Sequence, residues 1–229
     1  MEELHEYQFS ILRTLLFKPG ARFSELNKVG ISSDHFNFHV KQLSNWGLIK
    51  KENQKYFLTN KGKELAGRMD TEQLTIEKQA KLGVALHAVR KNKGVTEYLI
   101  HHRLKEPLYG WYGSHSGKIR RGEKPEETAK REFFEETGLT GKFSLKAIKQ
   151  QREFDATGKL LEDKYFWVYR VDDVQGTLKE KVEEGENLWM TKKEIKKLKN
   201  VFASFEEMYE VLESQEVLIL RGDRTLEKY

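Results

Sequence analysis

The stretch that decides the fold is residues 117–139, which read GKIRRGEKPEETAKREFFEETGL. Pro125 suits the first position of a helix, and Gly138 suits the residue just beyond its last turn. The two glutamates that follow the proline suit the positive N-terminal end of such a helix. The stretch therefore predicts a helix over residues 125–137.

Three glutamates lie on one side of this predicted helix. Glu132 and Glu136 are four residues apart, and Glu135 is three beyond Glu132, with Arg131 beside the set. Like charges repel unless a cation lies among them, and Mg2+ takes oxygen ligands. A metal held there can polarise phosphoryl oxygens and activate water. The alternative, a helix face whose charges only meet water, explains a single glutamate more readily than the whole set.

The spacing of these residue types is G-x5-E-x7-R-E-U-x-E-E-x-G-U, with U apolar, and it resembles the complete Nudix box. On this motif the chain is similar to the Nudix hydrolase superfamily. The resemblance implies an α/β/α sandwich with a mixed sheet. It also implies Mg2+- or Mn2+-dependent hydrolysis of a nucleoside diphosphate linked to another moiety. No subfamily signal follows the box, so the substrate stays open.

The resemblance further implies a set of metal ligands. Glu135 and Glu136 would be the main ligands, and the backbone carbonyl of Ser116 would assist them. Glu132 would be a further ligand or the general base. The prediction is thus a metal site built by one helix and the loop before it.

The same resemblance assigns supporting residues. Arg131 would hold the glutamates by a salt bridge, Glu123 would brace the loop, and Gly117 would permit its turn. The loop departs from the family pattern, because His115 and Ser116 stand where proline and glycine are frequent. His115 could contact a phosphate, but we expect a loop histidine that faces water.

Two further elements resemble parts of the family site. Family members often place the catalytic base in a loop before a Trp-containing strand, and Glu184 and Glu186 precede Trp189 in this way. An acidic surface loop is an equal alternative. Upstream, residues 98–103 resemble the strand whose terminal arginine, here Arg103, meets the phosphates of the substrate.

Composition limits the class of protein. At 229 residues the chain has room for one or two domains, and it contains no cysteine, which excludes a disulfide scaffold and a thiolate site. The net charge of +5 is spread along the chain, so it predicts little general attraction to nucleic acid. The N-terminal stretch is interrupted by charged residues. We therefore expect a soluble cytoplasmic protein with no membrane partner.

The first third of the chain has an organisation of its own. Apolar periodicity and turn residues predict three helices, two strands around a tight turn at Asn53 and Gln54, and a further helix. The predicted elements are a helix ending before Pro19, helices at 24–28 and 32–45, strands at 47–51 and 55–59, and a helix at 60–69. Phe36, Val40 and Leu43 should form the buried side of the third helix.

This order of elements resembles a winged helix-turn-helix domain over residues 1–72, joined by a linker at 73–80. The third helix would then face the major groove of DNA, and Lys50, Lys51 and Lys55 would meet phosphates. A winged domain used for dimerisation or protein contact is an equal alternative. The connecting stretch at 70–80 is expected to be helical.

Residues 81–229 would form the Nudix domain. Strands are expected from Lys81 onward, at 96–102, 143–154 and 165–171, and up to Trp189, with a closing helix at 201–212 whose buried side holds Phe205, Met208, Tyr209 and Leu212. The leading hypothesis is a metal-dependent pyrophosphohydrolase. The alternatives are a transcription regulator that senses a nucleotide metabolite, and an interaction module without chemistry.

Overall fold

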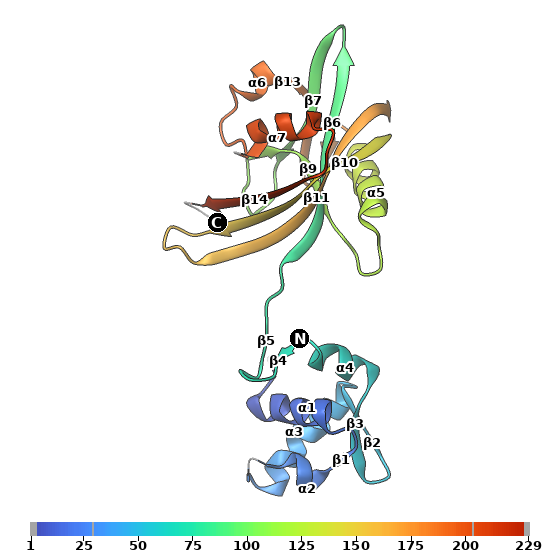
Figure 1. The fold of residues 1–229 in the computed structure, drawn as a ribbon, viewed down its shortest axis with the longest axis vertical. Coiled ribbons are helices and arrows are strands. Elements are labelled where there is room, and N and C mark those ends of the chain that lie inside the picture. The colour runs from blue at the N-terminus through green and yellow to red at the C-terminus, as the bar shows by residue number, and fades with distance from the viewer. Residues whose placement is uncertain (1–3, 29, 203, 227–229) are drawn as a thin grey trace. The chain divides into compact units, whose positions relative to one another are not determined.

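Apolar side chains gather into separate cores in two parts of the chain. The computed structural model describes residues 4–28, 30–202 and 204–226, and the side chains of residues 204–206 lie outside that description. The chain divides into two compact units, Met1–Lys78 and Gln79–Tyr229 (Figure 1). One apolar cluster belongs to the first unit and three belong to the second.

The elements of the N-terminal unit keep the order that the sequence predicted, with one short strand added. They are α1 (Glu6–Phe17), β1 (Ala21–Arg22), α2 (Phe23–Leu26), α3 (Ser33–Asn45), β2 (Ile49–Glu52), β3 (Lys55–Leu58) and α4 (Asn60–Ala66). Asn53 and Gln54 both have positive φ, at 48° and 63°, as a two-residue hairpin turn requires. The two-residue strand β1 was not predicted, and it pairs with β3 in the sheet order β1-β3-β2.

The packing of α3 follows its apolar spacing. The side chain of Ser32 accepts a hydrogen bond from the backbone N–H of His35 and caps the helix. Phe36, Val40 and Leu43 are all buried in the core of the unit, which confirms the predicted side of the helix. The outer side of α3 is thereby left facing water.

The segment after α4 differs from the sequence prediction. Instead of a helical connection, β4 (Met69–Asp70) pairs with β5 (Thr75–Ile76) in a short hairpin. Asp70 explains the difference, because its carboxylate accepts hydrogen bonds from the backbone N–H groups of Glu72 and Gln73, at 2.8 and 2.9 Å. A short acidic side chain that binds the backbone locally favours a turn over a helix.

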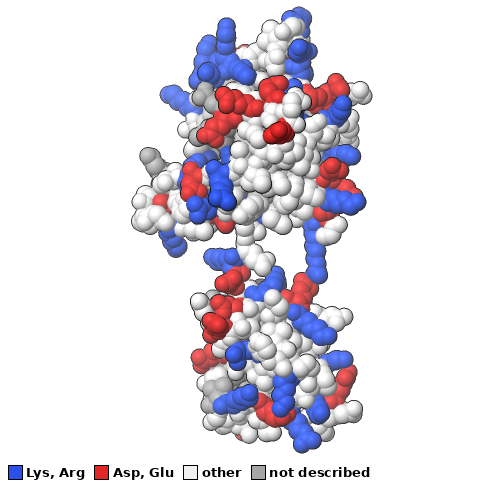
Figure 2. Space-filling view, in the orientation of Figure 1, with Lys and Arg blue, Asp and Glu red and all other residues white. Residues whose placement is uncertain are grey.

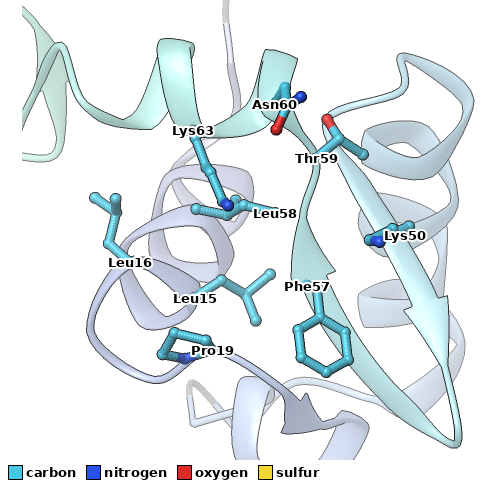
Figure 3. Close-up of a pocket in the computed structure, with 9 residues that line it drawn as sticks. All are labelled: Leu15, Leu16, Pro19, Lys50, Phe57, Leu58, Thr59, Asn60 and Lys63. Carbon is cyan, nitrogen blue, oxygen red and sulfur yellow. The ribbon is translucent and has the colours of Figure 1, made fainter.

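The N-terminal unit also contains an open pocket of about 580 Å³ between α1, the β2–β3 hairpin and α4 (Figure 3). Its lining is mostly apolar and contains no acidic side chain; the residues are Leu15, Leu16, Pro19, Lys50, Phe57, Leu58, Thr59, Asn60 and Lys63. A pocket without carboxylates does not provide the metal chemistry predicted above. The candidate active site therefore lies elsewhere, in the C-terminal unit.

The C-terminal unit is built around a mixed sheet. Its strands are β6 (Lys81–Asn92), β7 (Val95–Arg103), β8 (Tyr112–Gly113), β9 (His115–Lys118), β10 (Leu139–Phe154), β11 (Leu160–Gly176), β12 (Lys181–Val182), β13 (Gly185–Thr191) and β14 (Leu218–Thr225). Its helices are α5 (Pro125–Thr137), α6 (Lys192–Ile195) and α7 (Ser204–Glu213). The order is β12-β13-β7-β6-β11-β10-β14, with β8 beside β7 and β9 beside β6. The β6–β11 and β10–β14 pairs are parallel, and the others are antiparallel.

Alternation along β6 assigns helices to the two faces of the sheet. Val84 and Leu86 pack with α5, whereas Ala85 packs in the cluster that contains Met208 of α7. The helices thus cover opposite faces, as Figure 1 shows, and the predicted α/β/α sandwich with a mixed sheet is confirmed. Among the residues expected on the buried side of the closing helix, Met208, Tyr209 and Leu212 are buried, and the side chain of Phe205 lies outside the described residues.

Charge is distributed without a strong bias on the visible surface. In the view of Figure 2, basic and acidic side chains are interspersed over each unit. No helix among the described residues is long and apolar enough to cross a membrane. Because neither unit shows a large surface of one charge in this view, a functional site is expected in a local cluster of side chains.

Candidate active site

The helix α5 spans Pro125–Thr137 and confirms the helix predicted from the sequence. Pro125 takes its first position, and Glu126 and Glu127 lie in its first turn. Gly138 adopts a left-handed φ of 72°, and its N–H donates to the carbonyl of Phe134 at 2.9 Å, which ends the helix. These local rules place the glutamates of α5 without help from distant residues.

Arg131, whose side chain is only 18% exposed, forms a clamp between α5 and the loop before it. Its guanidinium donates to both carboxylate oxygens of Glu123 at 2.7 Å, to Glu132 at 2.6 Å and to Glu135 at 3.3 Å. The hydrogen bond from Arg131 lowers the pKa of Glu123 to about 2. Glu123 also accepts from the backbone N–H of Arg120, so it ties the preceding loop to the helix. The predicted bracing contacts of Arg131 and Glu123 are present.

Glu136 is the glutamate of the set with the greatest need for a cation. Burial raises its pKa to about 8, and the negative charges of Glu132 and Glu184 act in the same direction. Glu135 adds to this effect and Arg103 opposes it. Within the described part of the chain, no ion pair or side-chain hydrogen bond satisfies the Glu136 carboxylate.

Gly117 allows β9 to lie directly against the acidic set. A Cβ atom built on Gly117 would lie 2.1 Å from Cγ and 2.2 Å from Cδ of Glu132, closer than real side chains tolerate. Any other residue would push Glu132 away from the strand. Ser116, the predicted carbonyl ligand, precedes Gly117 on β9 and pairs with Ala85 of β6.

The donor set matches a hard divalent cation in chemistry, because it offers only carboxylate and carbonyl oxygens. Across residues 4–28, 30–202 and 204–226, however, no three acidic or histidine side chains are already placed to hold a metal ion. The reason is visible in the ion pairs of Arg131, which hold Glu132 and Glu135 on the guanidinium. Side-chain rotation toward Glu136 would be needed to complete a metal site.

The structure brings Arg103 and Glu184 to the acidic helix. Arg103 ends β7, and its guanidinium donates to the carbonyls of Pro107 and Glu106 at 2.8 and 3.0 Å. Glu184 pairs with Lys105 and lies 3.9 Å from Arg103. The hydrogen bond from Lys105 lowers the pKa of Glu184, so its carboxylate is ionised near neutral pH.

Glu186 lies differently from Glu184. Its carboxylate is 3.8 Å from Nδ1 of His102 and 3.7 Å from Nζ of Lys181. Neighbouring residues of a strand point to opposite faces, so Glu186 faces away from Asn187, whose side chain contacts the backbone of α5. Glu184 therefore acts electrostatically on Glu136, whereas Glu186 lies near His102 and Lys181.

His115 does not face water, contrary to the sequence expectation. It is 1% exposed on β9, and its Nε2 lies 2.8 Å from Oδ1 of Asn187. The expectation was wrong because the residues before the box form β8 and β9 rather than an open loop, and β9 pairs with β6. His101 of β7 also lies 3.0 Å from the same Asn187 oxygen through its Nδ1.

Asn187 determines the hydrogen positions of both histidines. Its Nδ2 donates to the carbonyls of Glu136 and Lys179 at 2.9 and 2.7 Å, so its Oδ1 must accept. His101 Nδ1 and His115 Nε2 therefore both carry the proton that they donate. Burial lowers the pKa of His115 to about 4, which keeps the imidazole neutral near pH 7.

The sequence alone did not predict that His101, Asn187 and His115 form one group. The three residues lie on β7, β13 and β9, and 86 residues separate His101 from Asn187. They meet because Asn187 pairs with His101 across β7 and β13. Only a correct prediction of that strand register would have revealed the group.

Comparison with known proteins agrees with this arrangement. The model of the NUDIX domain matches residues 81–212. The mutator MutT protein from Bacillus halodurans has 27% sequence identity to this chain. Its crystal structure matches with a TM-score of 0.50 over 61% of this chain and 86% of that chain. The NUDIX domain of Shewanella oneidensis NrtR, solved in complex with ADP ribose, is similar in fold. It is 16% identical, with a TM-score of 0.51, over 67% of this chain and 96% of that chain.

Proposed function

The chain belongs to the Nudix family, and from this we propose that it is a metal-dependent hydrolase that cleaves the diphosphate linkage of a nucleoside diphosphate derivative. One observation carries the proposal: Glu136 is half-buried, with a raised pKa, beside Glu132 and Glu135 on a single helix. A carboxylate in such surroundings is stabilised by a bound cation. The family relationship indicates that this cation is Mg2+ or Mn2+.

Glu135 and Glu136 would hold the metal, with Glu132 as a further ligand and the carbonyl of Ser116 assisting. When bound, the metal would polarise phosphoryl oxygens and lower the pKa of water. Arg131 supports the site in a different way, because its contacts with Glu123 keep α5 fixed to the loop before it. We propose that it also keeps Glu132 and Glu135 within reach of the position that the metal would occupy.

Glu184 is our first candidate for the general base. Its carboxylate is ionised near neutral pH, its charge acts on Glu136, and 47% of its side chain is exposed, so water can reach it. Glu132 is the second candidate, since it lies on α5 itself, and Glu186 is the third. A positioned base would contribute roughly 10²- to 10⁴-fold in rate.

In this proposal Arg103 would meet the phosphates of the substrate. Two backbone carbonyls hold its guanidinium, and its positive charge acts on Glu136. An arginine fixed in this way loses little conformational freedom when it binds a phosphate. The small-molecule partner would therefore approach between the end of β7 and the acidic side of α5.

The first experiment uses the purified chain with Mg2+ or Mn2+ and a panel of ADP-ribose, NADH, nucleoside triphosphates and dinucleoside polyphosphates. Products are identified by phosphorus NMR. Glu136→Gln should lower the rate by roughly 10³-fold or more, because it removes a charged metal ligand. Glu126→Gln, an identical change at an exposed position of the same helix, is the matched control and should keep its activity.

Three further variants, Glu184→Gln, Glu132→Gln and Glu186→Gln, rank the base candidates in the same assay. A Glu136→Gln variant with full activity would sink the metal site. Turnover lost in that variant but kept in Glu126→Gln would identify the substrate class.

A transcription regulator is the second candidate, favoured by the N-terminal unit. The outer side of α3 faces water, and the β2–β3 hairpin carries the exposed residues Lys50, Lys51 and Lys55. In this proposal the C-terminal unit binds a nucleotide metabolite and the N-terminal unit binds double-stranded DNA. Sensing requires the ligand to bind the two states of the protein unequally.

The regulator proposal is tested by DNA affinity at fixed salt, with and without each compound of the panel. A ligand that changes the affinity at least about 5-fold supports sensing. An affinity unchanged by every compound, or no binding to any DNA, counts against it. A hydrolase that also clears its own signal would pass both tests.

A further inference from the structure

The sheet of the C-terminal unit ends in a strand that the family domain does not account for. The family model matches residues 81–212, whereas β14 spans Leu218–Thr225. This strand was not predicted from the sequence. It pairs with β10 on one side, and in the described part of the chain no strand pairs with its outer edge. Figure 1 shows β14 at the border of the sheet.

The side chains of β14 do not protect its outer edge against pairing with another strand, as those of edge strands usually do. Ile219 is 81% exposed, and exposure alternates along the strand with Arg221 and Asp223 on the same face. Edge strands are templates for pairing with another chain unless charge or shape prevents it. Here the charges are of opposite sign and two residues apart.

We propose that β14 is a homodimerisation edge, on which two copies of this chain pair their β14 strands antiparallel about a twofold axis at Gly222. In that register Arg221 of each copy lies opposite the partner's Asp223, so the arrangement makes two cross-strand ion pairs. Ile219 lies opposite the partner's Thr225. The two sheets would join into one continuous sheet.

Charge selects this register over its neighbours. A twofold axis perpendicular to the sheet keeps each face on its own side, so only shifts of two residues in pairing are allowed. Centring on Arg221 would oppose two arginines, and centring on Asp223 would oppose two aspartates. Directly opposed like charges destabilise a sheet, and opposite charges contribute about 0.2–1 kcal/mol per pair.

The contacts within one chain prepare the aspartate for this role. Arg152 of β10 donates to both carboxylate oxygens of Asp223, at 2.9 and 2.6 Å, and fixes the orientation of the carboxylate. The partner's Arg221 would approach from the other side. Within the described residues Arg221 has no ion pair, so its charge is available to a partner.

This inference does not depend on the proposed activity. A single pair of eight-residue strands buries less surface than a standard interface, so the dimer should be weak. We expect a dissociation constant on the order of 10–100 µM, measured by analytical ultracentrifugation of the full chain. A chain that stays monomeric up to about 1 mM would overturn the proposal.

Charge reversal tests the register. Arg221→Asp alone, or Asp223→Arg alone, opposes like charges at both pairs and should weaken self-association at least about 10-fold. An equal mixture of the two variants pairs a doubly acidic strand with a doubly basic strand, and it should associate at least as tightly as the original chain. Dimerisation unaffected by either change, or a mixture that stays monomeric, would place the interface elsewhere.

Asp223→Arg also loses the ion pair with Arg152 and could fail to fold for that reason. A test with an introduced cysteine covers this case. The chain has no cysteine of its own, so one introduced thiol reports a single position. A Cβ on Gly222 would meet only the ends of two flexible side chains, Oε1 of Gln151 at 3.1 Å and Cε of Lys149 at 3.3 Å. Gly222→Cys should form an intermolecular disulfide on mild oxidation, because opposed Cα atoms are about 5 Å apart. Thr225→Cys should not form this disulfide, because residue 225 lies far from residue 225 of the second copy in the proposed register. Equal cross-linking of the two variants would contradict the register.

Discussion

Helix α5 is held by two contacts of opposite chemistry, one in its middle and one at its C-terminal end. In the middle of the helix, the charged group of Arg131 binds Glu123, which lies eight residues earlier in the chain. At its C-terminal end, the neutral amide of Asn187 binds the carbonyl of Glu136 from 51 residues away. The difference follows from charge: Glu136 already lies among negative charges, and a neutral anchor holds its backbone without adding another.

The largest effect should come from breaking the charged support. Arg131→Met removes the guanidinium that Glu123, Glu132 and Glu135 share and leaves Arg120, 4.0 Å from Glu135, as a nearby cation. The carboxylates then repel one another more strongly, and the loop loses its anchor. We expect kcat/KM to fall about 10²- to 10³-fold, or roughly 3–4 kcal/mol. Steady-state kinetics on the best substrate of the panel measure this loss.

Two variants sharpen the interpretation of the Arg131 result. Arg131→Lys keeps the charge but cannot form the two parallel hydrogen bonds to Glu123, so it should fall between Arg131→Met and the original chain. Lys130→Met removes a charge from the exposed neighbouring position and is the matched control. Equal losses in Arg131→Met and Lys130→Met would mean that the clamp has no special role.

The two supports also differ in how far the sequence could predict them. The Arg131 clamp depends on spacing within one helix and a loop of a few residues, so the motif predicted both partners. The Asn187 group depends on which strands pair and in what register, and the sequence around His115 suggested a water-facing loop instead. The helix α5 was predicted to the residue because its proline, its first-turn acids and Gly138 act locally.

The same distinction explains the rest of the fold. The strands β6 and β7 were predicted because Lys93 and Gly94 form a two-residue turn with positive φ, at 48° and 81°. The β4–β5 hairpin was missed because the side chain of Asp70 outweighed a polar pattern with no strong preference. For β14 the missing information is the neighbour, since parallel pairing with β10 brings together residues about 70 positions apart.

The second prediction breaks the neutral support. Asn187→Ala leaves the carbonyls of Glu136 and Lys179 and the donors of His101 and His115 without their partner. Each unsatisfied buried group costs about 1–3 kcal/mol. Water that enters the space of the missing amide offsets part of the total cost of these groups. We therefore expect the free energy of unfolding to fall by about 2–3 kcal/mol. Urea unfolding followed by tryptophan fluorescence measures it.

A matched control for Asn187 is Asn92→Ala, which removes an exposed amide that contacts Glu97 at 3.3 Å. That variant should stay within about 0.5 kcal/mol of the original chain. The catalytic rate of Asn187→Ala, measured below its unfolding range, should fall less than that of Arg131→Met. A larger loss of rate than of stability would show that the neutral group also acts on the chemistry.

The smallest effect concerns the charge that both supports surround. Because the pKa of Glu136 is raised to about 8, the folded chain without metal keeps a proton that the unfolded chain releases above its ordinary pKa of 4.5. Stability should therefore be fully present below about pH 4.5 and decline as the pH rises through about 8. The full shift corresponds to about 5 kcal/mol, but partial exposure and rearrangement of the neighbouring acids reduce our expectation to about 1–2 kcal/mol.

Comparing the original chain with Glu136→Gln in EDTA isolates this term, since the contributions of His115 and the other titrating groups cancel in the difference. The two unfolding free energies should agree near pH 5, and the Gln variant should be the more stable near pH 9, by about 1–2 kcal/mol. Mg2+ should remove that difference, because it favours the ionised carboxylate of Glu136. Parallel pH curves in EDTA would mean that Glu136 is already ionised and stabilised without metal. Electrostatic repulsion at Glu136 would then not explain why a neutral amide, and not a charged group, holds this end of α5.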